Sequence, residues 1–176
     1  DPSQAACSAL SGALCIMAGS QGTMNNFVWR NAEFQNYETI AGGRGAEPGF
    51  DGCDGVQTHM TNTKMTDPEI LEGRFPVRLR SFAIRRGSGG AGAYRGGHGA
   101  LRRLEFLTDV TVTTLCSHRT IPPFGAAGGG AGATGENWAE LPDGRKIALQ
   151  GNDEIDLPAG SIFGLATPGG GGWGAG

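Results

Sequence analysis

The chain has 176 residues and a formal net charge of −3. This length fits one domain that buries roughly 70% of its unfolded surface, and the acidic balance argues against general nucleic-acid binding, which needs a basic face. The 33 glycines exceed twice the usual share. They follow no strict G-X-Y repeat, which excludes collagen, and they alternate with apolar segments, so we expect a loop-rich folded domain. No apolar run approaches about 18 residues, and no basic stretch opens the chain, so we expect neither a membrane span nor a signal peptide.

The first segment predicts a helix over residues 3–18, because small and apolar side chains recur there at spacings of three and four. Ser3 would be its N-cap and Gly19 its end. The rest of the chain predicts short strands between glycine-rich turns, and apolar and polar residues alternate most clearly over 75–85. Strands are expected over residues 27–29, 36–40, 75–85, 100–107, 110–116, 146–149, 155–157 and 161–167. Without a regular strand–helix–strand alternation, the prediction is a single α+β domain over residues 1–176, dominated by antiparallel sheet.

The densest polar stretch covers residues 50–76. It holds too many polar groups for a core strand, because each would need a buried partner. We expect a loop that meets solvent or lines a polar cleft, followed by a short helix near 68–73. Asp67 would be the N-cap of that helix, Pro68 its first residue and Gly73 its end. This loop is predicted to be part of a functional surface.

Within this stretch, Asp51, Asp54 and His59 have the chemistry of hard-metal ligands, but they follow no recognised metal-site spacing. Turn-forming aspartates and a hydrogen-bonded histidine are the favoured interpretation. Cys53 could act as a thiol nucleophile near His59, although proximity in sequence is weak support for that role. Without a C-x-x-C pair, the four cysteines are expected to be reduced thiols in a cytoplasmic protein.

Two glycine-rich turns could bind an anion. Residues 42–45 follow a predicted strand, and their backbone N–H groups could approach an anion, although a bend that needs positive φ is the favoured interpretation. Residues 85–90 place two arginines beside flexible backbone donors, which suits a phosphate or carboxylate. Solvated arginines beside a hairpin remain the alternative.

Five blocks of sequence together resemble the hydantoinase B/oxoprolinase family. They are SQGTMNN at 20–26, YETIAGGRGA at 37–46, DGVQTHMTNTKMTDPEILEGRFPVR at 54–78, RRGSGGAGAYRGGHGALRRLEF at 85–106 and TPGGGGWG at 167–174. The blocks are collinear and cover nearly the whole chain. The resemblance implies the C-terminal part of a B-type subunit, with a larger N-terminal portion outside this chain. On that basis, the N-terminal helix and the apolar residues near 162–165 are expected to pack on that portion.

The resemblance also implies a function. Family members work with an A-type partner subunit that binds ATP and phosphorylates the carbonyl or enol oxygen of a small-molecule substrate. The B-type subunit then hydrolyses a lactam or cyclic imide such as 5-oxoproline or a hydantoin, or carboxylates a ketone. Some members bind a divalent metal, which would lie in the N-terminal portion. A non-catalytic docking domain within the complex is the third alternative, and hydrolysis is favoured as the commoner family activity.

The matched blocks imply site residues. His59 and Asn62 are expected to contact the reacting group as catalytic residues. The expected substrate-binding residues are Glu38, Thr39, Thr61, Arg85, Arg86 and Ser88, with Arg85 or Arg86 contacting the anion. Gln57 stands where the family's H-T-H-M-T-N-T form of this loop has a histidine, so a two-histidine site is not expected here.

Overall fold

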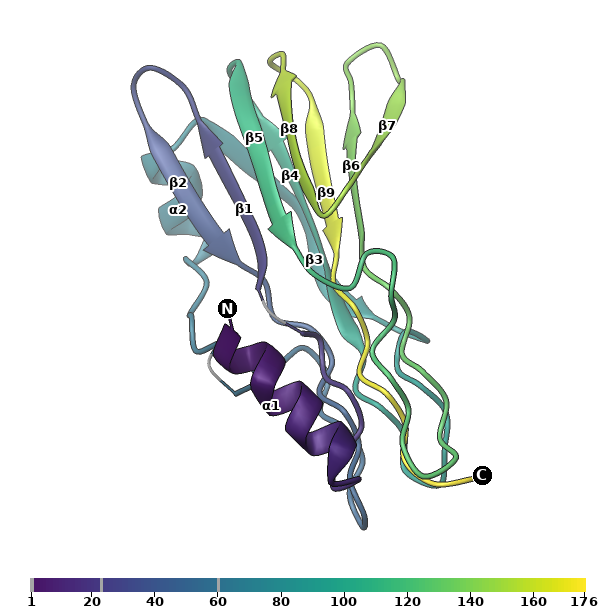
Figure 1. Ribbon diagram of the computed structural model, residues 1–176. Helices are drawn as coiled ribbons and strands as arrows, with labels where there is room; N and C mark the ends of the chain where they lie inside the picture. The colour runs from purple at the N-terminus through teal and green to yellow at the C-terminus, as the bar shows by residue number, and fades with distance from the viewer. Residues whose placement is uncertain (1, 23, 60) are drawn as a thin grey trace.

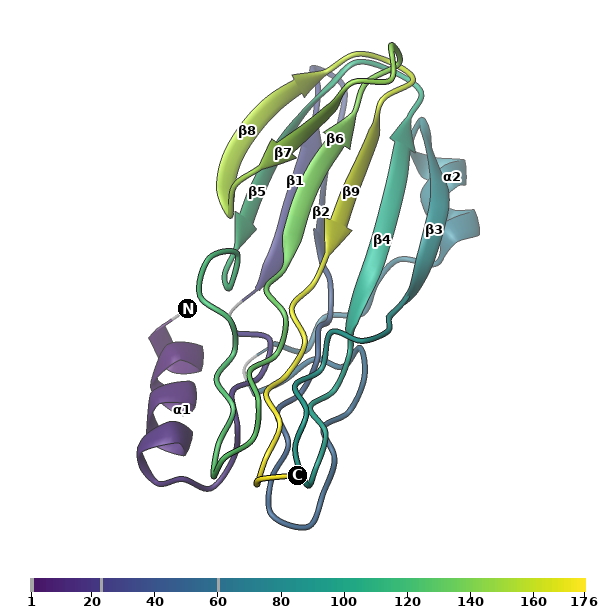
Figure 2. The ribbon, with the colours of Figure 1, turned by 90° about the vertical axis from the view of Figure 1, so that its right-hand side faces the viewer.

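A computed structural model of the chain describes residues 2–22, 24–59 and 61–176. Its strands form two antiparallel sheets that face each other (Figure 1, Figure 2). The first sheet has the order β2-β1-β5-β8 and is built from β1 (Asn25–Arg30), β2 (Gln35–Thr39), β5 (Val110–Cys116) and β8 (Asn152–Leu157). The second has the order β3-β4-β9-β6-β7 and is built from β3 (Val77–Arg85), β4 (Gly99–Phe106), β6 (Glu136–Glu140), β7 (Lys146–Leu149) and β9 (Ile162–Ala166). The predicted α+β class, mainly antiparallel β, is confirmed.

The core lies between the sheets, where alternate residues of each strand point inward. Phe27 and Trp29 of β1 are fully buried. The ring of Phe27 lies 4.9 Å from that of Phe163 in the other sheet, and the ring of Trp29 lies 6.1 Å from that of Phe106. These aromatic pairs are at the usual spacing for favourable ring contact. The expectation that residues near 162–165 pack outside this chain is therefore wrong for Phe163, which belongs to this core.

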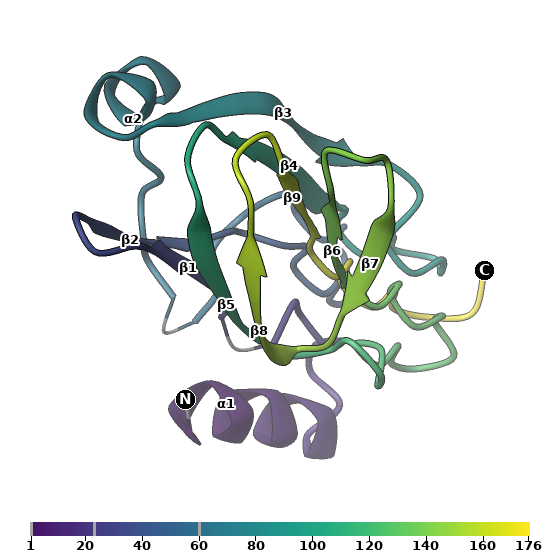
Figure 3. The same ribbon diagram turned by 90° about the horizontal axis from the view of Figure 1, so that it is seen from above.

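Two helices flank the sheets. α2 (Pro68–Arg74) begins as predicted, because Oδ1 of Asp67 accepts a hydrogen bond from the backbone N–H of Glu69 at 3.0 Å. It buries Leu71 and lies beside β3 (Figure 3). α1 (Pro2–Ala13) is shorter than the predicted helix over 3–18. Cys15 has a φ of 48°, which no right-handed helix accommodates. Neither helix of the described residues is both long and apolar enough to cross a bilayer.

The glycine-rich segments come together below the open end of the sandwich in Figure 1. Residues 167–174 run through the middle of this bundle. The backbone N–H groups of its consecutive residues donate to three different segments: Gly170 to Gly97 at 2.8 Å, Gly171 to Gly19 at 2.7 Å, and Gly172 to Gly130 at 2.8 Å. A strand in a sheet has only two hydrogen-bonded neighbours, whereas this segment is surrounded by hydrogen-bonded chains.

Backbone approach in this bundle is too close for side chains. A Cβ atom on Gly97 would lie 1.9 Å from the carbonyl oxygen of Cys53, and one on Gly43 would lie 2.0 Å from that of Gly97. Both distances are far shorter than van der Waals contact. The atoms approached belong to the backbone, so they cannot move aside as a flexible side chain could. The high glycine content therefore has a structural cause, as glycine does at the crowded axis of collagen.

The strand pattern differs from the prediction in one further place. β6 was not predicted, because its sequence ENWAE is poor in the β-branched residues that favour strands. It pairs with β7 across the predicted turn at residues 142–145. Because a hairpin turn requires a strand on each side, the predicted turn already indicated a strand before residue 142.

The bundle gives a stability prediction. Gly97→Ala places a methyl group against backbone and should lower the free energy of unfolding by about 3 kcal/mol or more. The matched control is Gly73→Ala in α2, where nothing lies within 4 Å of the added Cβ. It should stabilise the protein by about 0.5–1 kcal/mol, because alanine favours helix over glycine. Urea denaturation of both variants measures the difference, and equal effects would contradict a close-packed bundle.

Candidate functional site

The polar loop over residues 57–63 is closed by the side chain of its first residue, Gln57. Nε2 of Gln57 donates hydrogen bonds to the carbonyl oxygens of Thr39 and Thr63, at 3.4 and 3.3 Å. Its Oε1 accepts a hydrogen bond from Nε2 of Gln21, which is fully buried, at 3.5 Å. One amide side chain thus joins both ends of the loop and ties it to the end of β2.

A tight turn inside this loop presents His59. The backbone N–H and the hydroxyl of Thr61 both donate to the carbonyl oxygen of Thr58, at 3.0 and 2.7 Å. The hydroxyl also accepts from the backbone N–H of Thr58 at 3.0 Å. His59 has a φ of 52°, in the left-handed region. The turn leaves the side chains of His59 and Asn62 exposed, so both predicted catalytic groups lie on one loop.

The surroundings of His59 favour the neutral imidazole. Partial burial lowers the pKa of His59, and the positive charge of Arg44 lowers it further. An unperturbed histidine titrates near about 6.5. A side chain with a lower pKa is uncharged at neutral pH and has a ring nitrogen free to accept a proton.

Helix α1 supports the same loop from the outside. Among the described residues of α1, only Gln4 is buried. Nε2 of Gln4 donates a hydrogen bond to Oγ1 of Thr58 at 3.4 Å. Sequence patterns do not single out Gln4, because a glutamine in a run of small residues is usually solvent-exposed. Its contact shows that α1 is tied to the polar loop.

Glu38 and Thr39 lie beneath the surface. Glu38 faces the core from β2 and receives two hydrogen bonds from Arg102 of β4, at 2.6 and 2.7 Å. Both side chains are almost fully buried, with 3% and 1% of their area exposed. Burial raises the pKa of Glu38, and the contact with Arg102 offsets part of that rise. The pair joins the two sheets, and the buried Thr39 gives its carbonyl to Gln57.

The three residues predicted near the 85–90 turn differ in their surroundings. Arg85 donates to the carbonyl oxygens of Thr134 and Thr167, at 2.6 and 3.3 Å, and forms an ion pair with Glu136. Ser88 is buried and holds the turn, because its hydroxyl donates to the carbonyl of Arg85 at 2.7 Å. Arg86 is exposed. Among the described residues, no hydrogen bond joins this turn directly to the 57–63 loop.

The aspartates of the central stretch stabilise another turn. Oδ1 of Asp51 accepts from the backbone N–H of Arg95 at 2.7 Å, and Oδ1 of Asp54 accepts from that of His98 at 2.8 Å. Within the described ranges, no three His, Cys, Asp or Glu side chains gather into a metal-binding group. Cys53, the alternative nucleophile, is an exposed free thiol.

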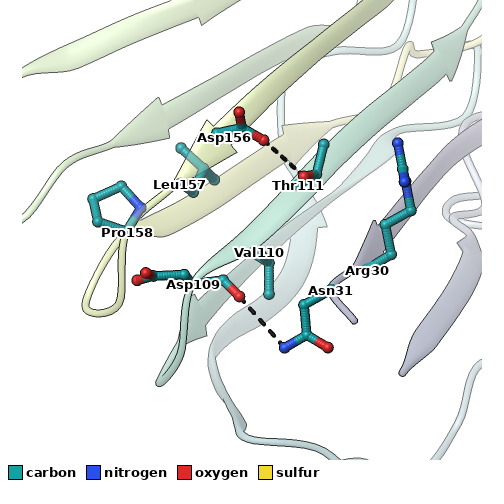
Figure 4. A pocket seen from close by; sticks show the side chains of 8 residues that line it. All are labelled: Arg30, Asn31, Asp109, Val110, Thr111, Asp156, Leu157 and Pro158. Atoms are coloured by element: carbon teal, nitrogen blue, oxygen red, sulfur yellow. Dashed lines mark hydrogen bonds between the residues drawn. The ribbon is translucent and has the colours of Figure 1, made fainter. Parts of the chain in front are cut away.

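The sandwich also has surface pockets away from these residues. One of about 420 Å³ lies where β1 ends and β5 begins, and Arg30, Asp109 and Asp156 line it (Figure 4). Asp156 accepts a hydrogen bond from the Thr111 hydroxyl at 2.7 Å. None of the eight predicted site residues lines this pocket, so it is a feature separate from the polar loop.

A chain of polar side chains, which the sequence did not indicate, runs inward from the loop. Gln57 accepts from Gln21, Gln21 accepts from Asn25 at 3.1 Å, and Asn25 accepts from Nη1 of Arg119 at 3.0 Å. Arg119 also donates to Oδ1 of Asn137 on β6. Gln21 and Asn25 belong to the matched SQGTMNN block, but only the fold places them between Gln57 and Arg119.

Comparison with known proteins gives consistent matches. A family model described as hydantoinase B/oxoprolinase matches residues 1–176. The chain is 48% identical over 158 residues to 5-oxoprolinase 1 of Arabidopsis thaliana, covering 90% of this chain and 12% of that protein. It is 43% identical over 157 residues to 5-oxoprolinase of Dictyostelium discoideum, covering 89% of this chain and 12% of that protein. The chain thus spans about an eighth of the length of these relatives.

A solved structure has the same fold. The ATP-dependent caprolactamase from Pseudomonas jessenii superposes with a TM-score of 0.74 at 21% identity, covering 91% of this chain and 30% of that chain. At this identity the likeness concerns the fold.

The buried Glu38–Arg102 pair gives a second stability prediction. Glu38→Gln leaves the buried guanidinium without a counter-charge and should lower the free energy of unfolding by about 3–5 kcal/mol. The matched control is Glu154→Gln, because Glu154 pairs with Arg30 at the surface, where both side chains are about half exposed. That change should stay within about 1 kcal/mol. Chemical denaturation of both variants tests the contrast; similar losses would show that the buried pair is not what links the sheets.

Proposed function

Because the chain belongs to the hydantoinase B/oxoprolinase family, we propose that it is part of an ATP-dependent amidohydrolase that opens a lactam or cyclic imide ring, such as 5-oxoproline or a hydantoin. The observation that carries this proposal is the family match over residues 1–176, together with relatives named 5-oxoprolinase at 43% and 48% identity. Since the chain spans only 12% of each of these relatives, the proposed activity requires further polypeptide. We assign ATP binding to an A-type subunit and the remaining site residues to an N-terminal B-type portion.

The chemistry explains why two steps are needed. An amide is a poor electrophile, and transfer of a phosphoryl group from ATP to its carbonyl oxygen makes the carbon more reactive. Water then attacks that carbon while a base accepts its proton and donors hold the anionic intermediate. Collapse of the intermediate breaks the ring C–N bond, the nitrogen takes up the proton, and a second water molecule releases the phosphoryl group as inorganic phosphate. The task proposed for this chain is the second step: to position the intermediate and to move that proton.

We assign proton acceptance to His59. Its imidazole is neutral at physiological pH, it is exposed, and the Thr58–Thr61 turn fixes its backbone. Asn62 follows on the same loop, with an exposed amide that can donate to a developing negative charge. Gln57 acts indirectly, because it joins the ends of the loop that carries both groups.

The remaining predicted residues fall into two groups: one is proposed to contact the intermediate, and the others hold the surrounding structure. Arg86 is exposed and is the proposed contact for the anionic intermediate. Arg85 has its donors engaged by backbone carbonyls and Glu136, and Ser88 holds the same turn. We propose that these two residues support Arg86. Glu38, Thr39 and Thr61 would likewise act by holding the sheet and the loop rather than by touching substrate.

The first activity prediction is for His59→Asn. Asparagine tolerates the left-handed backbone that His59 adopts, so the loop should keep its shape while the base is lost. Coupled turnover in the complete assembly should fall about 100-fold or more. Thermal unfolding should be unchanged within a few degrees. Full turnover by this variant would overturn the assignment of His59.

The assay also separates the alternative functions. Turnover is measured with ATP and a panel of lactams, hydantoins and ketones, each with and without bicarbonate. Ring opening without bicarbonate supports the proposal, whereas ATP hydrolysis only with a ketone and bicarbonate would identify a carboxylase. If His59→Asn and Asn62→Ala both leave turnover intact while the assembly falls apart on changes at the surface of α1, the chain serves as a docking domain.

The second activity prediction concerns pH. Removing the positive charge of Arg44 makes protonation of His59 easier, so Arg44→Gln raises the pKa of His59 toward its ordinary value. The acid limb of the kcat/KM profile should therefore move to higher pH. Arg145→Gln, at an exposed hairpin arginine, is the control and should leave the limb in place. An unmoved limb in Arg44→Gln would show that another group is the base.

A further inference from the structure

A groove lies on the outer face of the first sheet, on the side of β1 away from the core. Alternate residues of a strand face the same side, and the register places Val28 of β1 between Tyr37 of β2 and Thr113 of β5. Along β1 from Val28, Asn26 lies beside Leu115 of β5 on the same face. These five residues line the groove, whose volume of about 720 Å³ lies in the usual range for a small-molecule site.

The walls of the groove are apolar and open to solvent. The exposed fractions of Tyr37 and Leu115 are 49% and 52%, and Val28 is half-buried. The hydroxyl of Thr113 already donates to Glu154 at 2.7 Å. A ligand with an apolar part therefore gains by covering these walls, because that removes apolar surface from water.

The base of the groove holds a polar group whose hydrogen bonds are incomplete. Asn26 is 2% exposed, and within the described part of the chain its Oδ1 accepts no hydrogen bond. Its Nδ2 donates to the sulfur of Met24 at 3.2 Å, and a thioether sulfur is only a weak acceptor. Most buried polar atoms have a good partner, because an unsatisfied one costs free energy. A ligand that supplies both partners removes that cost.

The side chain of Met24 lies over this amide and can be displaced. Its sulfur also accepts a hydrogen bond from the hydroxyl of Tyr37 at 3.9 Å, while the oxygen of that hydroxyl accepts from Thr39 at 3.1 Å. Two donors, one from Asn26 and one from Tyr37, thus share one sulfur atom. A methionine side chain is unbranched and flexible, so an oxygen atom of a ligand can take the place of the sulfur and accept both hydrogen bonds.

The amide of Asn26 also selects the shape of its ligand, because it presents an N–H donor and a carbonyl acceptor side by side. Its complement has a carbonyl and an N–H on the same edge, so that two hydrogen bonds form, as when asparagine binds an edge of adenine. An open-chain secondary amide is trans and directs its N–H and C=O to opposite sides. The ring of a small lactam holds its amide cis. Asn26 therefore favours a cyclic amide over an open-chain one.

We propose that this groove binds a cyclic amide. The carbonyl oxygen of the lactam replaces the sulfur of Met24 and accepts from Nδ2 of Asn26 and the hydroxyl of Tyr37. The N–H of the lactam donates to Oδ1 of Asn26. The methylene groups of the ring cover Val28 and Leu115.

The groove adjoins the polar loop. Asn26 pairs with Thr39 across β1 and β2, and the carbonyl oxygen of Thr39 accepts a hydrogen bond from Gln57 at 3.4 Å. The inference deepens the proposed function, because it names the groups that recognise the cyclic amide, and it rests on that function for the ligand's role as substrate. Binding itself requires neither ATP nor turnover, so the two proposals fail separately.

Protection of a thiol in the complete assembly, without ATP, measures binding. Leu115→Cys places a small apolar thiol beside Asn26 at a half-exposed position. Its alkylation by iodoacetamide is followed by peptide mass spectrometry while δ-valerolactam is added. Half-maximal protection is expected at about 1–10 mM, with no protection of the exposed native thiol of Cys53. Equal protection of both thiols, no protection, or an introduced thiol that iodoacetamide never reaches would each overturn the site.

A second pair of ligands tests the hydrogen bonds. N-methyl-δ-valerolactam keeps the ring and the carbonyl but lacks the N–H, so it leaves Oδ1 of Asn26 without a donor and should bind about tenfold more weakly. Equal binding of the two lactams would show apolar contact alone and contradict the role of Asn26. Adenosine carries a similar donor and acceptor edge. Protection by adenosine at lower concentrations than by δ-valerolactam would overturn the assignment to cyclic amides.

Variants locate the second donor. Tyr37→Phe removes only the hydroxyl and should weaken binding of δ-valerolactam about threefold or more. The matched control is Tyr94→Phe, because Tyr94 lies in the glycine bundle, where its backbone pairs with Trp173; it should leave binding unchanged. Equal weakening by both changes would contradict the contact with Tyr37. Turnover of δ-valerolactam by an assembly that shows no protection would overturn the groove and leave the proposed function standing, whereas protection without turnover of any cyclic amide would do the reverse.

Discussion

The close approach of glycine backbones in the bundle is the constraint on which the rest of the molecule depends. A sheet holds its strands about 4.8 Å apart with side chains above and below, whereas here one extended chain is surrounded by others that touch its backbone. The carbonyl oxygen of Cys53, for example, lies so close to Gly97 that residue 97 has no room for a side chain. The hydrogen bonds of these segments fix both the sandwich and the loops that leave it.

Both groups of predicted site residues are attached to this bundle. The 57–63 loop begins just after Val56, whose N–H donates to Gly42, and the 85–88 turn continues into Gly90, whose N–H donates to Gly170. Rigid backbone contact can position loop side chains without a large side-chain core beneath them. Within the sandwich, the buried Glu38–Arg102 ion pair also fixes the structure, because it joins one sheet to the other.

The sequence predicted the parts of the fold that follow from local chemistry. The Asp67 cap and most strands depend on residues near one another in the chain, so patterns of capping and alternation reveal them. β6 escaped because its side chains favour strands weakly, and its pairing partners are distant or across a turn. Within the site, the exposed loop was indicated by its polarity. The burial of Glu38 and the hydrogen bonds of Arg119 were not, since both depend on residues 64 and 94 positions away.

The position of residues 167–174 has a consequence for how the protein reaches its native state. This segment follows in sequence all the segments that it contacts, yet it occupies the centre of the bundle and bonds to segments near residues 19, 43, 97 and 130. Those segments lack their hydrogen-bond partners in residues 167–174 until these residues have been synthesised. Domains that rely on contacts distant in sequence fold slowly, because chain entropy is lost before the contacts form. The sandwich and its glycine bundle should therefore be completed after translation of this segment, and a ribosome-bound chain that stops before residue 167 should remain sensitive to protease.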